Sequence, residues 1–342
     1  MERLSFNLEP GVGGAAVGEQ APDRRQDMEQ DMEFELAPME GLTTYIYRST
    51  FEKYYGGIAR YYTPFLASKH LSSREKNEVL PEHNEGMRLI PQILSNRAEE
   101  FLEIARALAG YGYDCVNLNL GCPSGTVAAK RRGAGFLAAT QELDAFLEEI
   151  FDKCPLQISI KTRIGIRDEA EWESILRIYE KYPIAELIVH TRLQTDFYKH
   201  PARPHTFRAA KRLSTPLCYN GDIDSGEAYR ALCAAYPDLR RVMIGRGLAA
   251  DPELLEVLHG APRRDAGRLR SFLSDICDRY IAEMSGGERN TLYKLKEIWV
   301  HLASSFPGAE KYVRKIKKAN RLVEYEAAVD TLFAACEYAG VQ

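Results

Sequence analysis

Residues 115–120 (CVNLNL) and 156–161 (LQISIK) are two short apolar runs, and a helical pattern at 142–151 lies between them. A strand, a helix and a second strand in this order place the two strands parallel in one sheet. Similar runs recur along the chain. Eight such units predict an α/β fold whose parallel sheet closes into a (β/α)8 TIM barrel. The other six runs are residues 33–39 (EFELAPM), 58–65 (IARYYTPF), 87–94 (MRLIPQIL), 187–190 (LIVH), 216–220 (PLCYN) and 241–245 (RVMIG).

The chain of 342 residues is longer than a single hydrophobic core usually supports, which is roughly 250 to 300 residues. Residues 1–31 lack apolar periodicity, so we expect a disordered N-terminal extension. Residues 32–262 would form the barrel. From residue 263 onward the patterns are helical, which predicts a small C-terminal helical bundle domain. Its helices are expected at 267–284, 290–305, 309–319 and 325–338.

Composition and charge narrow the class of protein. Hydrophobic residues make up 45% and charged residues 27% of the chain, which is typical of a globular protein. No apolar run could cross a membrane and no signal peptide is recognisable, so we expect a cytoplasmic protein without membrane contact. The seven cysteines show no metal-binding spacing, which predicts reduced thiols and no metal site. The net charge of −4 means that any nucleic-acid contact must be local, and no protein partner is indicated.

Barrel enzymes carry their sites on the loops after the carboxyl ends of the strands. Polar side chains and glycines follow these ends here, and we expect them to converge on one pocket. Glycines after the seventh and eighth strands could cradle a phosphate, although each alone could simply form a tight turn. The residues concerned are Pro38, Met39, Gln92, Asn119, Cys122, Lys161, Arg163, His190, Asn220, Gly221, Asp222, Gly245 and Arg246.

Three of these residues have side chains suited to chemistry. An unpaired lysine at the position of Lys161 would be costly without an anionic partner, although it could instead reach the rim or pair with an acid. His190 could be a catalytic group or a satisfied core histidine. Cys122 lies between Gly121 and Pro123 in a loop, where a thiol can donate a proton.

Six motifs in this order resemble the tRNA-dihydrouridine synthases, FMN-containing barrels with a helical C-terminal domain. The resemblance extends from Glu35 to the C-terminus. It rests on LAPMEG at 36–41 with Thr43 and Arg48, NLNLGCPS at 117–124, KTRIG at 161–165, His190 with Arg192, NGDI at 220–223 and MIGRG at 243–247.

The resemblance implies the reduction of uridine to 5,6-dihydrouridine in tRNA. NADPH would reduce FMN, hydride would pass from flavin N5 to uracil C6, and Cys122 would protonate C5. Asn119 and Arg163 would position the uracil. The flavin would be bound by Pro38, Met39, Gln92, Lys161 and His190, and its phosphate region by Asn220, Gly221, Asp222, Gly245 and Arg246.

The resemblance also implies contacts with tRNA outside the pocket. Candidates are Lys130 and Arg131, with Arg132, after the cysteine motif, and a basic stripe on the third C-terminal helix. Such a stripe could also be an ordinary solvated helix face. The stripe consists of Lys311, Arg314, Lys315, Lys317 and Lys318.

Two departures from the family pattern affect the substrate. This chain has Thr191-Arg192-Leu193-Gln194 where many relatives have Gly-Arg-Thr after the histidine, and Gly125 where many have lysine. The modified tRNA position therefore does not carry over.

Two other functions stay open: a flavin barrel that reduces a free pyrimidine, and a catalytically silent RNA-binding barrel. The helical tail argues against the first, and the joint presence of Cys122, Lys161, His190 and Arg246 argues against the second.

Overall fold

The computed structural model describes residues 32–260, 264–284 and 286–341, which belong to one compact unit spanning 32–342. The expected disordered extension at 1–31 and the expected domain boundary at 262/263 lie outside the described residues. The division of the remaining chain into a barrel domain and a helical domain stays a prediction.

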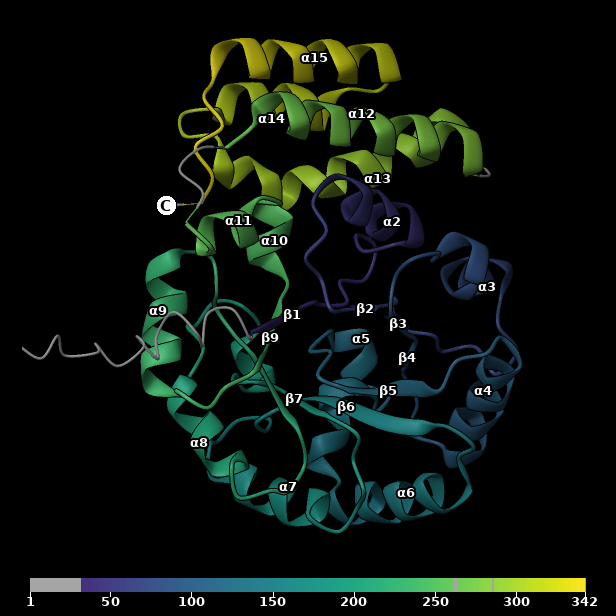
Figure 1. The fold of residues 1–342 in the computed structure, drawn as a ribbon. Coiled ribbons are helices and arrows are strands. Elements are labelled where there is room, and N and C mark those ends of the chain that lie inside the picture. Colours follow the sequence, from purple (N-terminus) through teal and green to yellow (C-terminus); the bar gives the residue numbers. More distant parts are fainter. Residues whose placement is uncertain (1–31, 261–263, 285, 342) are drawn as a thin grey trace, which may run out of the picture. The chain divides into compact units, whose positions relative to one another are not determined.

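The described strands form one sheet in which every pairing is parallel. The two ends of this sheet are β3 and β4, which are separated only by Pro91. Leu66 also bridges to Ile93, so the chain after β2 reaches β4 and the sheet closes (Figure 1). The predicted barrel is confirmed. Its strands are β1 (Glu33–Leu36), β2 (Arg60–Tyr62), β3 (Leu89–Ile90), β4 (Gln92–Ile93), β5 (Cys115–Leu120), β6 (Gln157–Arg163), β7 (Leu187–His190), β8 (Leu217–Asn220) and β9 (Arg241–Ile244).

The first three predicted runs are longer than the strands observed. The run at 33–39 ends as a strand at Leu36, the run at 58–65 ends at Tyr62, and the run at 87–94 divides into β3 and β4. Each run contains a proline, which has no N–H to donate to a neighbouring strand. At Pro91 the carbonyl still accepts a hydrogen bond from the Asn117 N–H at 2.8 Å, so the barrel wall continues across the break.

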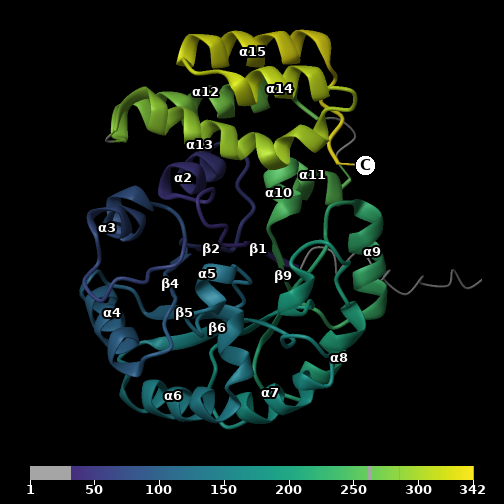
Figure 2. The same cartoon turned by 180° about the vertical axis from the view of Figure 1, so that it is seen from behind.

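Helices surround the barrel and continue beyond it (Figures 1 and 2). The four expected C-terminal helices are present, each with ends within three residues of the prediction. The helices are α2 (Tyr45–Tyr54), α3 (Ser73–Val79), α4 (Ala98–Gly110), α5 (Gly125–Ala128), α6 (Thr140–Lys153), α7 (Glu171–Tyr179), α8 (Phe207–Ala210), α9 (Gly226–Ala235), α10 (Arg246–Ala250), α11 (Leu254–Leu258), α12 (Ala266–Glu283), α13 (Gly287–Leu302), α14 (Glu310–Lys318) and α15 (Leu322–Ala335). Within the described ranges, none is long and apolar enough to cross a membrane.

The C-terminal helices contact the β1–α2 segment and the end of α10. The hydroxyl groups of Thr44 and Tyr280 lie 2.9 Å apart, and Lys294 Nζ donates to the Gly41 carbonyl at 2.9 Å. These contacts bring α12 and α13 to the loop that follows β1. Residues of the helical tail therefore border the carboxyl end of the barrel.

Candidate functional site

A cavity of about 180 Å³ opens at the carboxyl ends of the strands, as expected for a barrel. Six of the residues predicted to converge there line it together, and Cys122 shares the cavity with both Lys161 and His190. The prediction that the thiol, the lysine and the histidine meet at one end of the barrel thus agrees with the structure. The six residues are Pro38, Gln92, Asn119, Cys122, Lys161 and His190.

The alternation of side chains along β5 builds the wall of this cavity, because every second residue of a strand points to the same face. Asn117 and Asn119 both contact Gln92 on the neighbouring strand β4: Gln92 Nε2 donates to Asn117 Oδ1 at 2.8 Å, and Asn119 Nδ2 donates to Gln92 Oε1 at 2.7 Å. Asn119 Oδ1 accepts from the backbone N–H groups of Gly121 and Cys122, at 3.0 and 2.9 Å. Asn119 therefore fixes the loop that carries the thiol.

The Cys122 side chain is held as a thiol. Burial raises the pKa of Cys122, while the nearby Arg163 and Lys161 lower it to a smaller extent. The Cys122 carbonyl accepts from the Ala134 N–H at 3.0 Å, and a Cβ at Gly133, where φ is +56°, would lie 2.9 Å from that carbonyl oxygen. The loop is thus packed closely against residues 133–134, and a neutral thiol can serve as a proton donor.

Lys161 reaches the cavity from the inner face of β6. Its Nζ donates to Asn220 Oδ1 at 2.8 Å, and no carboxylate of the described residues pairs with it. Burial, with the neighbouring Arg163, lowers the pKa of Lys161 to about 8. Neither a rim position nor an acidic partner, the two alternatives open from the sequence, is found. An anionic or electron-rich ligand would supply the missing partner.

His190 is buried and neutral. Burial lowers the pKa of His190 well below its ordinary value, and the surrounding cations Lys161, Arg163, Arg192 and Arg246 lower it further. Its Nε2 lies 3.1 Å from Arg192 Nη1. Because a guanidinium can only donate, Nε2 must accept this hydrogen bond, and the proton of the neutral ring is assigned to Nδ1.

Asp222 lies between two arginines beside the cavity. It pairs with Arg192 and, at 2.6 Å, with Arg246, and these contacts hold the pKa of Asp222 below its usual range although burial opposes this. With Lys161 and Arg163 also close to His190, cations outnumber anions in this part of the site. Such a surplus suits a phosphate or another anionic group, so the residues present fit a nucleotide-type cofactor such as FMN.

Close packing leaves little room for a side chain at the glycines after β8 and β9. A Cβ at Gly221 would lie 2.3 Å from the Tyr219 hydroxyl oxygen, and one at Gly247 would lie 2.2 Å from the Ile223 carbonyl oxygen. A Cβ at Gly245 would lie 3.1 Å from Ala37 Cβ and 3.5 Å from Met39 Sδ. These contacts show close packing at Gly221 and do not decide between a tight turn and a phosphate role, so both stay predictions.

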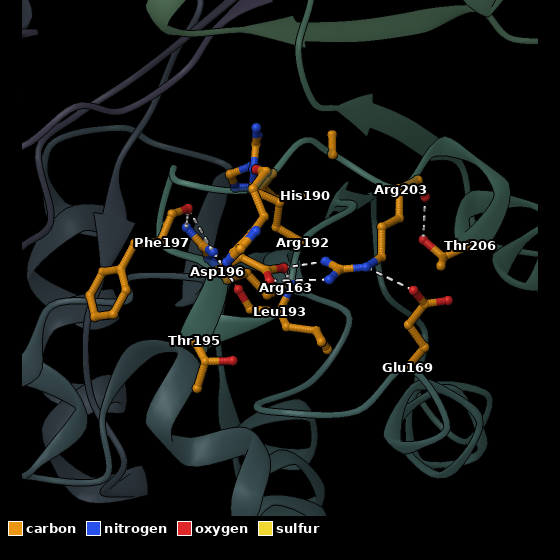
Figure 3. Close-up of polar contacts among 12 residues, drawn as sticks. Arg163, Glu169, His190, Arg192, Leu193, Thr195, Asp196, Phe197, Arg203 and Thr206 are labelled. Atoms are coloured by element: carbon orange, nitrogen blue, oxygen red, sulfur yellow. Dashed lines mark hydrogen bonds and ion pairs between the residues drawn. The ribbon is translucent and has the colours of Figure 1, made fainter.

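Arg163 does not line the cavity. It is fully buried, and its Nε donates to the Gly121 carbonyl at 3.0 Å. Nη1 donates to the Leu193 carbonyl at 2.6 Å, and both terminal nitrogens contact the Phe197 carbonyl at 3.2 to 3.3 Å (Figure 3). Arg163 therefore joins the Cys122 loop to the loop after β7.

The structure adds site residues that sequence reasoning missed. Tyr198 lines the cavity, is 52% exposed, and has its ring 4.4 Å from the guanidinium of Arg246. Arg163 and Arg192 lie 5.5 and 5.8 Å from the same ring. The wall also includes Glu40, Pro64, Phe65, Gly121 and Pro123. The adjacent aromatic pair Phe197 and Tyr198 in an otherwise polar loop was the available signal for Tyr198.

Most of the predicted RNA-contact residues lie on exposed surface, but Arg132 is half-buried and forms an ion pair with Glu100 at 2.7 Å. Arg131 forms an ion pair with Glu142 at 2.7 Å, whereas Lys130 is exposed and has no ion pair within the described ranges. On α14, Val313 and Ile316 are buried, and the exposed positions carry the basic stripe expected from the sequence. Lys311, Arg314 and Lys315 are all exposed.

The cavity at the carboxyl end of this parallel barrel contains a thiol, a half-buried lysine and a neutral histidine. This is the place and the kind of side-chain set that define the active site of a barrel enzyme. The family model described as Dihydrouridine synthase (Dus) matches residues 35–337. The chain therefore belongs to the dihydrouridine synthase family and is an oxidoreductase.

Individual relatives agree with this family. The chain is similar to "tRNA-dihydrouridine synthase B" of Pasteurella multocida, at 26% identity over 71% of this chain and 74% of the relative. It is also similar to a "Probable tRNA-dihydrouridine synthase" of Staphylococcus epidermidis, at 27% identity over 88% of this chain and 94% of the relative. Among solved structures, morphinone reductase superimposes with a TM-score of 0.48 and 14% identity, over 69% of this chain and 88% of that chain.

Proposed function

We propose that this protein reduces uridine to 5,6-dihydrouridine in tRNA, with FMN as cofactor and NADPH as electron donor. The observation that carries the proposal is the shared cavity of Cys122, Lys161 and His190. The family and the names of the relatives supply the uridine and the tRNA. We expect the protein to act in the cytoplasm, where it would meet tRNA.

The chain offers a consistent set of residues for holding FMN. Lys161 and neutral His190 would face the polar edge of the flavin, and the cations around Asp222 would favour its phosphate. When bound, FMN reduced by NADPH supplies the hydride for uracil C6. The complete set is Pro38, Met39, Gln92, Lys161, His190, Asn220, Gly221, Asp222, Gly245 and Arg246.

Cys122 would provide the proton for uracil C5. Its raised pKa keeps the proton on sulfur until the base is in place. Once the proton leaves, the positive charges of Arg163 and Lys161 favour the thiolate that remains. Asn119 would orient both the uracil and the Cys122 loop, because its carbonyl oxygen already holds that loop. Arg163 would act on the uracil by fixing the same loop from its other side.

The rest of the tRNA must contact surfaces outside the cavity, since a base in a folded RNA has to be extruded to reach it. Lys130 and Arg131 on the barrel and Lys311, Arg314 and Lys315 on α14 are the proposed phosphate contacts. All five side chains are exposed, as such contacts require.

The Cys122→Ala variant tests the proposal. We expect it to bind flavin and to oxidise NADPH with oxygen as electron acceptor, while dihydrouridine formation falls about 10²- to 10⁴-fold, the usual loss for a general acid. Cys154→Ala, at a half-buried cysteine after α6, is the matched control. Dihydrouridine in tRNA is measured by mass spectrometry. Unchanged product formation in Cys122→Ala would remove Cys122 from this role, and equal reduction of free uridine and tRNA would instead identify a reductase of free pyrimidines.

A further inference from the structure

A second hollow of about 210 Å³ lies beside the candidate site. The two hollows share three wall residues, Glu40, Pro64 and Phe65. The second hollow is bounded by the β1–α2 segment and α3 of the barrel, and by Tyr280 and Lys294 from the C-terminal helices. Because ligand pockets of roughly 300 to 1,000 Å³ accept drug-sized molecules, a hollow of this size suits a single heterocycle.

The walls of this second hollow combine aromatic rings with a free acceptor. Tyr45 and Tyr280 line the hollow and are buried. The Tyr280 hydroxyl contacts Thr44 and the Tyr45 ring stacks on His83, so the two rings contribute apolar lining. The Glu40 side chain is 40% exposed, and its only ion pair within the described ranges is with Arg74 Nη1 at 3.6 Å. A carboxylate with an unused oxygen therefore stands at the boundary between the two hollows.

We propose that this second hollow binds the nucleobase next to the uridine being reduced, and that it prefers guanine. The inference rests on the proposed function. A nucleotide extruded into the first cavity carries its neighbours with it, and enzymes of flipped bases often read these flanking nucleotides. Since the hollows share a wall, an adjacent base is the part of the RNA that reaches the second one.

The preference for guanine follows from the chemistry of Glu40. An ionised carboxylate can only accept hydrogen bonds. Guanine presents two neighbouring donors, its ring N1–H and its 2-amino group, whereas the matching edge of adenine pairs one donor with an acceptor that a carboxylate repels. Arg74 and Lys294, both on this wall, can neutralise the connecting phosphate.

The experiment uses the full-length flavin-loaded enzyme and tRNA transcripts. The reduced uridine is first mapped by mass spectrometry, and each nucleotide beside it is then made guanosine, adenosine or abasic in turn. We expect kcat/KM to fall about tenfold from guanosine to adenosine or an abasic site on one side of the uridine, with an unchanged rate of flavin reduction by NADPH. Equal kcat/KM values for all three on both sides would overturn the inference.

A variant links this preference to the hollow. Ser73→Trp fills the hollow from an exposed position of its wall, and Lys76→Trp, which is exposed on the same helix but outside the wall, is the control. Ser73→Trp should lower kcat/KM for the guanosine substrate to the abasic value and leave the abasic substrate unchanged. An equal loss on every substrate, or no loss on any, contradicts the inference. If wild-type enzyme forms no dihydrouridine on any transcript, the proposed function itself fails.

Discussion

Lys161 is a half-buried lysine whose pKa lies close to neutral pH. Burial and Arg163 lower its pKa to about 8, so the ammonium is lost as the pH rises through that value. An anionic cofactor group binds the protonated form more tightly. We therefore expect flavin affinity to fall as the pH is raised from about 7 to about 9, by up to roughly tenfold per pH unit above the pKa. Fluorescence titration of flavin at each pH measures this.

The Lys161→Met variant provides the comparison. It keeps the length and apolar part of the side chain but has no titrating group, so its flavin affinity should be lower at pH 7 and should not change with pH in this range. A variant with the same pH dependence as the wild type would show that another group is responsible.

The alternation of β-strand side chains is sufficient to predict part of the site. Asn119 on β5 and Lys161 on β6 are register partners and both lie near the strand ends, so their convergence on one cavity follows from the sequence. The same pattern puts Arg163 on the face of Lys161, but the structure shows it bonded to the Leu193 and Phe197 carbonyls. Those carbonyls are placed by a loop whose path has no periodicity, so sequence patterns could not predict the contact.

The loop between β7 and α8 depends on arginine contacts for its conformation. Phe197 has φ of +48° and its carbonyl is held by Arg163, while Arg203 pairs with Asp196 and with Glu169 (Figure 3). A positive φ at a phenylalanine is strained and needs such support.

Arg163→Lys should release this loop, because a single ammonium cannot replace a fork that reaches three carbonyls. We expect the free energy of unfolding to fall by about 1–3 kcal/mol and amide hydrogen exchange at residues 193–198 to accelerate. Arg167→Lys, at an exposed position of the loop after β6, is the control and should change neither quantity. Unaltered exchange at 193–198 in Arg163→Lys would show that contacts other than those of Arg163 hold the loop.

The basic stripe on α14 has a measurable signature if it contacts RNA. Replacing Lys311, Arg314 and Lys315 with alanine removes three phosphate contacts, so the apparent Kd for tRNA should rise. The slope of log K against log salt concentration should become shallower by about 2 to 3. Filter binding across a salt series measures both quantities.

The control removes the same charge elsewhere. Lys153, Lys181 and Lys211 lie at the ends of α6, α7 and α8, and each already pairs with an acid. Their triple alanine variant should leave the salt slope unchanged. Equal slopes in the two triple variants would favour the solvated-face interpretation of α14.

For the whole molecule, the closed barrel was predictable because eight apolar runs alternate with helical patterns, and each run became part of the wall. The C-terminal helices were predictable for the same reason. What periodicity could not provide is the position of those helices against the barrel. That position depends on single side-chain contacts such as Thr44 with Tyr280 and Lys294 with Gly41, which produce no repeating pattern. The second hollow is a product of this packing and was therefore not predicted.

The opposite end of the barrel from the site contains a buried pair of carboxylates. The Tyr62 hydroxyl lies 3.0 Å from Glu35 Oε2 and 3.2 Å from Glu186 Oε2, and Arg60 pairs with Glu35 at 2.7 Å. Burial and the neighbouring charge of Glu35 raise the pKa of Glu186. Glu186 therefore keeps its proton to a higher pH in the folded state, and this links the stability of the barrel to pH.

The sign of this linkage follows from proton binding. The pKa of Glu186 is higher in the folded state, about 7, than its ordinary value of 4.5. Between these two values the folded state binds more protons than the unfolded state, so the free energy of unfolding falls as the pH rises from about 4.5 to about 7. One proton contributes at most about 1.4 kcal/mol per pH unit.

Glu186→Gln cannot titrate, so urea unfolding between about pH 5 and pH 8 should give a shallower decline of the free energy of unfolding than in the wild type. Glu148→Gln, at an exposed position of α6, should follow the wild type. Parallel declines in Glu186→Gln and wild type would show that Glu186 does not carry the proton that sets this pH dependence.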